Sequence, residues 1–245
     1  MTAFRLDGRR ALVTGAGRGI GCAIAEALAV AGAEVVLVAR SADQVDRAAA
    51  ALRDRGFPAH ARAVDVTDLS AFAAMVRDAP PFDIFVNNAG TNRPKPLAQV
   101  TEEDYDAVMD LNLKAAIFAA QAVAARMARG SIINVSSQMG HVGAANRTLY
   151  CASKWAIEGF TKALAIELAP RGIRVNTICP TFVETPLTRP YLDDPAFRED
   201  VLRKIKLGRL ATVEEVANGV VFLASDAASF MTGSALMLDG GWTAE

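Results

Sequence analysis

Short apolar runs alternate with longer segments of helical period along the whole chain. A continuous apolar run bounded by turn residues is typical of a strand buried on both faces of a parallel sheet. Such runs predict strands at residues 11–13, 34–39, 59–64, 82–86, 131–135, 173–178 and 235–238. The segments between them predict helices at 22–30, 43–55, 101–129, 150–169 and 212–224, and one more that begins at Leu69.

The alternation continues through all 245 residues without a linker, an internal repeat or a low-complexity stretch. Strands that alternate with helices are the pattern of a parallel sheet covered by helices on both faces. The sequence therefore predicts the α/β class, with one doubly wound parallel sheet of about seven strands in a single domain, residues 1–245.

Residues 186–210 depart from this pattern, because they combine three prolines with mixed charge and two aromatic residues, Tyr191 and Phe197. One interpretation is a mobile lid over a binding site. An ordinary amphipathic surface helix is the other, and the pattern leaves both open.

The composition is that of a well-packed globular protein, since 52% of the residues are hydrophobic and 22% are charged. A net charge of −1 gives no reason to expect nucleic acid or an anionic membrane as a partner. No segment has the ~18 uninterrupted apolar residues of a spanning helix, and the N-terminus lacks an apolar signal region. We expect a cytoplasmic protein without membrane association.

Cysteine and histidine are too few and too scattered for a disulfide framework or a metal site. The three cysteines are Cys22, Cys151 and Cys179, and the two histidines are His60 and His141. No pair has the C-x-x-C spacing of a zinc site, so we expect no metal.

A glycine-rich turn follows the first predicted strand, and its sequence from Thr14 to Gly21 fits T-G-x-x-x-G-x-G. Glycines between a strand and a helix let the backbone approach a pyrophosphate, which the helix N-terminus then binds. Gly15, Gly19 and Gly21, with Arg18 and Ile20 between them, are therefore candidate cofactor-binding residues. A structural turn without a ligand is the alternative.

The end of the second strand indicates which dinucleotide is bound. A carboxylate there would hold the ribose hydroxyl of NAD, but this strand ends at Arg40 and the next acidic residue is Asp43. A guanidinium can grip a 2′-phosphate, and Arg18 could reach the same group. The sequence favours NADP(H), with NAD(H) as the alternative if both arginines are solvated surface charges.

Polar or small residues also follow the other strands, at the sheet edge where ligands bind in open α/β folds. Asp65 could accept from the adenine amino group or cap the helix from Leu69. Asn88, Ala89 and Gly90 offer an amide and room for a flat ring, and Ser137 presents a hydroxyl. Asn112 falls inside a predicted helix beside its apolar stripe of Val108, Leu111, Ala115 and Phe118, so we expect a buried role such as positioning a water.

Tyr150 and Lys154 lie four residues apart in a predicted helix, and therefore on one face of it. A nearby ammonium favours phenolate over phenol. We therefore expect Lys154 to lower the pKa of Tyr150 toward the working pH, as general acid/base chemistry on a carbonyl or alcohol requires.

Taken together, the motifs resemble the short-chain dehydrogenase/reductase family over nearly the whole chain. They are the glycine turn, Asn87-Asn88-Ala89-Gly90, Asn112, Ser137, Tyr150-x-x-x-Lys154 and the turn from Pro180 to Thr185. Pro180-Thr181 departs from the Pro-Gly usual in the family.

The resemblance implies a role for each matching residue. Tyr150 would be the general acid/base, Ser137 would bind the substrate oxygen, Lys154 would bind the nicotinamide ribose, and Asn112 would hold a water in a proton relay. On the cofactor side, Val183 and Thr185 would contact the carboxamide, and Asp65, Val66 and Asn88 the adenosine. The resemblance also implies a dimer or tetramer.

The predicted reaction is hydride transfer between a nicotinamide and a secondary alcohol or ketone. The candidate substrate residues are Ser137, Gln138, His141, Asn146 and Tyr150, and the candidate pocket segments also contain Arg147, Met139, Phe182 and Leu187. Their polar groups favour a polyol, sugar or sugar acid, and a 3-oxoacyl group on acyl carrier protein is the runner-up. A dinucleotide-binding sensor or scaffold without turnover is the alternative from another class.

Overall fold

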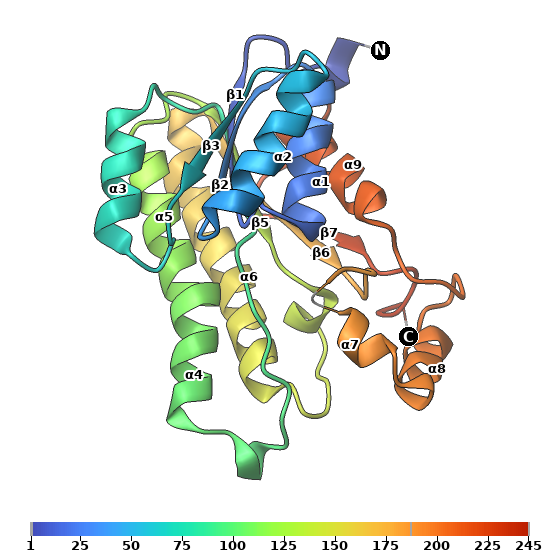
Figure 1. The fold of residues 1–245 in the computed structure, drawn as a ribbon. Coiled ribbons are helices and arrows are strands. Elements are labelled where there is room, and N and C mark those ends of the chain that lie inside the picture. Colours follow the sequence, from blue (N-terminus) through green and yellow to red (C-terminus); the bar gives the residue numbers. More distant parts are fainter. Residues whose placement is uncertain (1, 187, 245) are drawn as a thin grey trace.

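Seven parallel strands form one sheet at the centre of the molecule, in the order β3-β2-β1-β4-β5-β6-β7 (Figure 1). The structure, a computed structural model, describes residues 2–186 and 188–244. The strands are β1 Arg10–Thr14, β2 Glu34–Ala39, β3 Ala59–Ala63, β4 Ile84–Asn87, β5 Gly130–Val135, β6 Ile173–Pro180 and β7 Ala235–Leu238. All seven predicted strands are present. The predicted doubly wound sheet is therefore confirmed.

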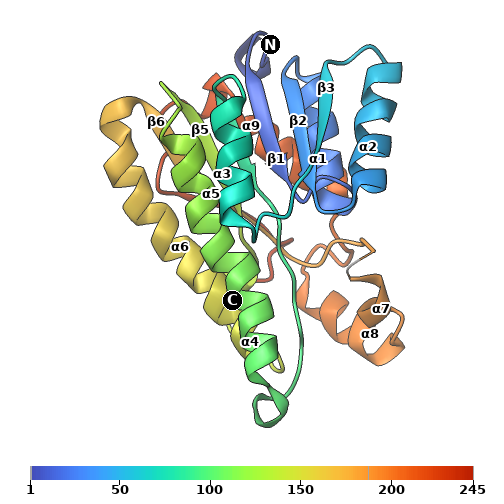
Figure 2. The same cartoon turned by 60° about the vertical axis from the view of Figure 1, so that its left-hand side comes forward.

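Helices cover both faces of the sheet (Figure 2). They are α1 Gly19–Val30, α2 Ala42–Asp54, α3 Leu69–Asp78, α4 Glu102–Met109, α5 Ala115–Ala124, α6 Thr148–Leu168, α7 Arg189–Leu192, α8 Pro195–Lys204 and α9 Val213–Ala224. Single 3-10 turns occur at Thr2–Phe4, Leu97–Gln99, Gln138–Gly140, Ala169–Arg171 and Asp226–Ala228.

Two apolar layers hold the helices on the sheet. Leu28 of α1, Val45 of α2 and Val220 of α9 pack on one face. Phe72 of α3 and Val123 of α5 pack on the other, where α6 also lies. Strands buried on both sides account for the continuous apolar runs in the sequence.

The chain reverses its direction across the sheet at β1. Strands β2 and β3 extend the sheet on one side of β1, and β4 returns to pair with its other side. A ligand site in this kind of sheet lies at such a switch point, beyond the carboxyl ends of the strands. The fold therefore places the ends of β1 and β4 where a ligand is expected.

The predicted helix at 101–129 is present as one helical run from Glu102 to Ala124, so it ends earlier than predicted. A π-helical turn at Asp110–Lys114 divides this run into α4 and α5. π turns interrupt α-helices most often at functional sites, and this one has the buried Asn112 at its centre. The turn also shifts the helical register, which leaves Phe118 exposed although the apolar stripe included it.

Residues 102–124 are long and apolar enough to span a membrane by length and composition alone. In the fold this run is one of the covering layers. The α5 residues Ala119, Ala120 and Val123 are buried in the apolar layer with Phe85 of β4, and α5 also contacts α3.

Residues 188–210 contain the packed helices α7 and α8, joined and followed by turns. Leu192, Val201 and Ile205 make an apolar cluster with Met139 and Phe182. Leu187, a candidate pocket residue, lies outside the described residues.

Candidate functional site

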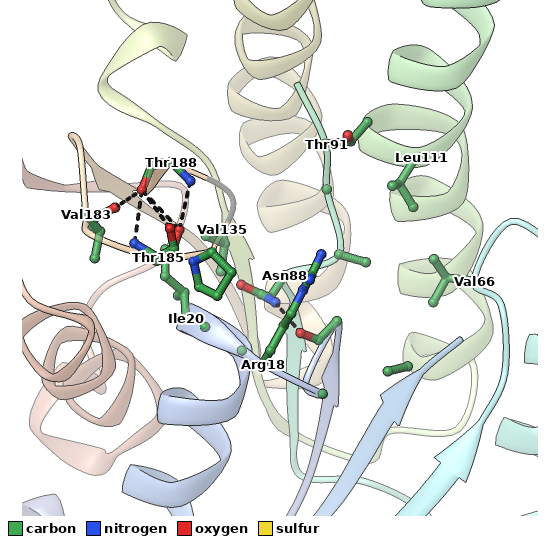
Figure 3. Close-up of a pocket in the computed structure, with 18 of the residues that line it drawn as sticks. Arg18, Ile20, Val66, Asn88, Thr91, Leu111, Val135, Val183, Thr185 and Thr188 are labelled. Atoms are coloured by element: carbon green, nitrogen blue, oxygen red, sulfur yellow. Dashed lines mark hydrogen bonds between the residues drawn. The ribbon is translucent and has the colours of Figure 1, made fainter. Parts of the chain in front are cut away.

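A pocket of about 710 Å³ lies at the carboxyl ends of the central strands. Figure 3 shows side chains from separate parts of the chain around it, among them Arg18 beside the glycine turn, Asn88 after β4 and Thr185 after β6. Most of the predicted site residues are on its wall: Gly15, Arg18, Gly19, Ile20, Gly21, Arg40, Asp65, Val66, Asn88, Ala89, Gly90, Ser137, Tyr150, Lys154, Val183 and Thr185.

The glycine turn passes close to the end of β4. A Cβ added to Gly15, whose φ is +65°, would lie 2.9 Å from Asn88 Nδ2. The Asn88 side chain donates to Thr14 O at 2.8 Å, and Thr14 Oγ1 accepts from the Asn88 and Ala89 amides at 3.0 and 3.1 Å. These bonds join β1 to β4 at the switch point and fix the floor of the pocket.

Helix α1 begins at Gly19, within the glycine turn. Its N-cap residue is Arg18, whose side chain makes no capping hydrogen bond. The first amides of a helix need partners, and a phosphate group can supply them. Arg18 is itself exposed at the same point. The turn and the helix start thus form an anion-binding cradle.

Positive charge is concentrated at the end of the pocket near β2. The Arg40 side chain is 75% exposed, and its only ion pair among the described residues is a long one of 4.0 Å with Asp65. Arg18 and Arg40 both line the pocket. Two accessible guanidiniums with no strong internal partner suit a phosphate ester.

Asp65 was predicted either to cap the helix from Leu69 or to contact adenine, and the structure excludes the cap. Asp68, not Asp65, caps α3 by accepting from the Ala71 amide at 2.9 Å. Asp65 Oδ1 instead accepts from the amide and hydroxyl of Thr67, at 2.9 and 2.7 Å. Asp65 therefore holds its own turn while it borders the pocket, and its contact with adenine stays a prediction.

Helix α6 brings the predicted acid/base residues to the pocket beside the end of β5. Lys154 Nζ lies 5.5 Å from the centre of the Tyr150 ring and donates to Val135 O at 2.9 Å. Ser137 Oγ donates to Gln138 Oε1 at 2.7 Å and accepts from the Met139 amide at 3.1 Å. A phenol, a hydroxyl and an ammonium therefore converge on one region of the wall.

The predicted lowering of the Tyr150 pKa is wrong. Burial raises the pKa of Tyr150 to about 12, although a hydrogen bond with Ser137 and the charge of Arg147 act against this rise. Burial also lowers the pKa of Lys154 to about 8, against the charges of Cys179 and Glu158. Desolvation outweighs the attraction expected from the helical spacing, so Tyr150 is a protonated phenol at neutral pH.

Asn112 lies behind the wall rather than on it. Its Oδ1 accepts from the Thr91 amide at 2.8 Å, and its Nδ2 donates to Thr91 O at 2.9 Å and to Ser153 Oγ at 3.1 Å. Thr91 lines the pocket and Ser153 precedes Lys154. Asn112 thus links the π turn to the segment at Thr91 and, through Ser153, to α6.

Three predicted substrate residues are not on the pocket wall. Gln138 is buried beside Ser137, with its Nε2 lacking a hydrogen-bond partner among the described residues. Asn146 is exposed, with a φ of +61° in the turn before α6. His141 lies against Cys179 and Glu158 instead. Their roles with substrate stay predictions.

His141, Glu158 and Cys179 form a small polar cluster behind the site. The Cys179 thiol donates to Glu158 Oε1 at 3.3 Å, and His141 Nε2 lies 3.5 Å from the Cys179 sulfur. The three ligand atoms are close enough to hold a metal ion. Burial and the Glu158 charge raise the pKa of Cys179 to about 12, which disfavours the thiolate that metals bind.

Sequence reasoning missed several wall residues. Most are neighbours of predicted ones along the chain, so the strand ends already marked them: Gly17, Ala39, Ser41, Val64, Thr91, Val135, Ser136 and Pro186. Pro180 and Thr181, which also line the pocket, belong to the turn that the sequence motif includes. Gln44, Leu111 and Thr188 lie on or beside helices and carry no signal in the sequence. Thr188 closes the turn after β6, because its hydroxyl accepts from the Thr185 amide at 3.0 Å (Figure 3).

A dinucleotide phosphate fits the groups present. The volume is within the roughly 300–1,000 Å³ of small-molecule sites. Glycines leave the backbone of the turn open to a pyrophosphate, and the cations beyond it match a 2′-phosphate. The phenol, hydroxyl and ammonium lie on the same wall, where the reacting ring of the dinucleotide would lie.

Comparison with known proteins gives consistent matches over the whole chain. A family model described as enoyl-(acyl carrier protein) reductase, of the short-chain alcohol dehydrogenase type, matches residues 15–243. The chain is 43% identical to L-xylulose reductase of Bos taurus, with 98% of this chain and 99% of the relative covered. It is 39% identical to gluconate 5-dehydrogenase of Gluconobacter oxydans (strain 621H), with 98% and 96% covered.

A solved structure is equally similar. The gluconate 5-dehydrogenase of Burkholderia cenocepacia J2315, in complex with NADP and tartrate, superposes with a TM-score of 0.95 at 38% identity. The match covers 100% of this chain and 98% of that one.

Proposed function

The chain belongs to the short-chain dehydrogenase/reductase family, and from this premise we propose that it is an NADP(H)-dependent oxidoreductase acting on a secondary alcohol or ketone. The observation that carries the proposal is the meeting of Ser137, Tyr150 and Lys154 on the wall of the pocket that the glycine turn opens. A sensor or scaffold without turnover would have no use for that set of side chains.

Each of these residues has a distinct part in the proposed reaction. Ser137 holds the substrate oxygen, and Tyr150 gives a proton to a ketone or takes one from an alcohol. Lys154 binds the nicotinamide ribose and keeps a positive charge 5.5 Å from the Tyr150 ring. Asn112 acts as a positioning residue, through Thr91 and Ser153, and the water relay of the family remains part of this proposal.

The raised pKa of Tyr150 gives the two directions different pH dependences. A protonated phenol suits donation to a ketone at neutral pH. Alcohol oxidation needs the phenolate, of which there is little when the pKa is about 12. Oxidation should therefore become faster as the pH rises.

The cofactor is NADP(H), which supplies or accepts the hydride when bound. The glycine turn and the first amides of α1 hold the pyrophosphate, and Arg18 and Arg40 hold the 2′-phosphate. Asp65, Val66 and Asn88 contact the adenosine, and Val183 and Thr185 the carboxamide. The NADP complex of the Burkholderia relative supports this choice over NAD(H).

The substrate is a small polar molecule: a polyol, a sugar or a sugar acid. Relatives named L-xylulose reductase and gluconate 5-dehydrogenase, similar from end to end, support this class. Reduction of a 3-oxoacyl group on acyl carrier protein is the second candidate. The family model's description names an enoyl reductase, which shares the acyl carrier protein but reduces a different bond.

The remaining proposals concern the whole protein. Residues 1–245 form one catalytic domain in which the segment around 186–210 closes over substrate as a lid. The chain acts in the cytoplasm as a dimer or tetramer. Apolar side chains exposed on α4, α5 and α6 support the oligomer, namely Tyr105, Phe118, Trp155 and Ile166.

Replacing Tyr150 with Phe tests the acid/base assignment. Loss of the phenolic hydroxyl should lower turnover by about 10²–10⁴-fold, because the proton no longer has a carrier. Nucleotide binding, followed by fluorescence titration, should change little. The assay follows NADPH and NADH absorbance over a panel of polyols, ketoses, aldonates and a 3-oxoacyl thioester.

Tyr105→Phe is the matched control, since Tyr105 is exposed on α4. It should keep full activity. Substantial turnover by Tyr150→Phe would contradict the mechanism, and better turnover with NADH than with NADPH would contradict the cofactor assignment.

A further inference from the structure

Arg147 is a buried cation at the entrance of α6, three residues before Tyr150. Only 9% of the residue is exposed. Its guanidinium carbon lies 5.7 Å from the centre of the Phe182 ring and 5.2 Å from that of Phe197. Phe182 follows Thr181, which lines the nucleotide pocket. Arg147 therefore stands where the pocket meets the apolar cluster of α7 and α8.

No carboxylate of the described residues is paired with this charge. Within residues 2–186 and 188–244, Arg147 makes neither a hydrogen bond nor an ion pair through its side chain, and its ring contacts are the two phenylalanines. The ionisable side chains that act on it are Tyr191, Tyr150 and Cys151. Burial lowers the pKa of Arg147, which shows that the surroundings oppose the cation.

The nitrogens of the Arg147 guanidinium are not fully enclosed by protein, however. Buried nitrogens without a partner and without solvent access occur elsewhere, as in Arg174 Nη1, but no nitrogen of Arg147 is among them. Arg147 does not line the nucleotide pocket itself; it lies next to it, against Phe182 and three residues before Tyr150. The Phe182 ring is itself held in place, with Trp242 stacked on it at 5.8 Å and Phe197 edge-on at 5.6 Å.

A buried guanidinium without an anionic partner is energetically unfavourable unless a ligand supplies that partner. Contacts with ring faces stabilise a guanidinium, but they leave its five N–H donors unused. Desolvating a charge without an anion costs several kcal/mol, and such conflicts between charge and burial are expected at functional sites. The fork of donors matches a carboxylate, which it can bind through two parallel hydrogen bonds.

We propose that Arg147 is the carboxylate-binding subsite of the substrate chamber, so that the preferred substrate is a sugar acid rather than an uncharged polyol or sugar. The carboxylate binds Arg147 while a carbinol carbon further along the substrate lies beside Tyr150 and Ser137. Gln138 supports this arrangement from behind the wall, since its Oε1 accepts from the Ser137 hydroxyl. This inference rests on the proposed oxidoreductase function and selects one substrate class within it.

Wild-type enzyme provides the first test. Initial rates with NADP⁺ are measured for pairs of equal carbon number, an aldonate and its alditol, such as D-gluconate with D-glucitol and the five- and four-carbon pairs. The aldonate of the best pair should have the higher kcat/KM by about 30-fold or more, as expected for a charge-assisted hydrogen-bonded pair. Equal or better oxidation of the alditols would overturn the inference.

Substitutions at Arg147 provide the second test. Arg147→Gln should lower kcat/KM for the aldonate by about 30- to 100-fold, chiefly through KM, because the carboxylate is remote from the reacting carbon. Its kcat/KM for the alditol should stay within about threefold. Arg147→Lys should lie between the two, since an ammonium keeps the charge but not the bidentate geometry.

Arg77→Gln is the matched control. Arg77 is an exposed arginine on α3, away from the pocket, with its side chain 67% accessible and paired with Asp78 at 3.1 Å. It should leave the aldonate preference unchanged. An equal loss on both members of a pair in Arg147→Gln would make Arg147 a structural residue and overturn the proposal.

Different results would contradict the oxidoreductase function and the carboxylate subsite. Absence of NADP(H)-dependent turnover with every member of the panel contradicts the proposed function. Turnover that favours alditols, ketoses or the thioester leaves the function intact and contradicts the carboxylate subsite. If Arg147→Gln fails to fold, the wild-type comparison of matched pairs still decides.

Discussion

Lys154 combines a functional position with an unfavourable environment. Its side chain is almost fully buried, and one hydrogen bond, to Val135 O, is all that it makes within the described residues. Burial lowers its pKa from 10.5 to about 8. Below pH 8 the folded protein therefore carries a buried ammonium whose desolvation opposes folding, and a residue of this kind is kept for activity rather than stability.

Replacing Lys154 with Met should make the stability of the protein respond differently to pH. The unfolded chain binds more protons than the folded one between about pH 8 and 10.5, because the folded-state pKa is the lower. The lysine's contribution to stability therefore rises across that window. Relative to wild type, Lys154→Met should lose on the order of 2–3 kcal/mol between pH 8 and 10.5.

Urea titrations of both proteins from pH 7 to 10.5 measure this difference. The lost hydrogen bond to Val135 shifts the Lys154→Met stability by an amount independent of pH, so only the slope is informative. Parallel stability curves for the two proteins would mean that Lys154 has an ordinary pKa.

The glycine turn between β1 and α1 packs with its backbone close to the residue after β4. This close packing limits which side chains the turn can accept. A Cβ on Gly21 would collide with Asn88 Nδ2 and with Gly15 O. Gly15 O belongs to the backbone and cannot rotate away, and Asn88 is held by its bond to Thr14. This element therefore tolerates no side chain at Gly21, although a helix interior usually favours alanine.

Gly21→Ala should consequently destabilise the protein by about 1–3 kcal/mol or more and weaken NADP(H) binding. Thermal unfolding and nucleotide titration measure the two effects. The control is Gly143→Ala, because a Cβ on Gly143 meets nothing within 4 Å. A Gly21→Ala protein with wild-type stability and affinity would show that the turn can move.

At the scale of secondary-structure elements, the site motifs could be predicted because parallel strands bring distant residues to one edge of the sheet. Asp65, Asn88 and Ser137 each follow an apolar run, so the order of runs already placed them together. The π turn was hidden, since Val108, Leu111 and Ala115 fit an ordinary helix as well. The pKa of Tyr150 was beyond sequence reasoning, because it depends on how much protein surrounds the phenol rather than on the spacing to Lys154.

At the scale of the whole molecule, an apolar surface crosses α4, α5 and α6. Phe118 is 43% exposed, Trp155 54% and Ile166 78%. A shallow depression beside Ile166 is lined by Ala165, Ala169 and Pro170, among others. Large apolar side chains exposed on neighbouring helices are typical of contacts between subunits.

Light scattering should therefore give a mass of two or four chains. Ile166→Glu should shift the mass toward one chain, because a charge in an apolar interface must be desolvated on assembly. Val30→Glu is the control: Val30 is also exposed, but it ends α1 on the opposite face of the sheet. A monomeric wild-type protein would contradict the proposed assembly.

The pocket wall is assembled from the glycine turn, the ends of β2, β3, β4 and β5, the start of α6 and the segment after β6. A ligand bound there contacts regions that are far apart along the chain and holds them together. Its binding energy adds to the cohesion of the fold as a whole. The cell's supply of nucleotide thus becomes one of the factors that set how long each copy of this enzyme survives.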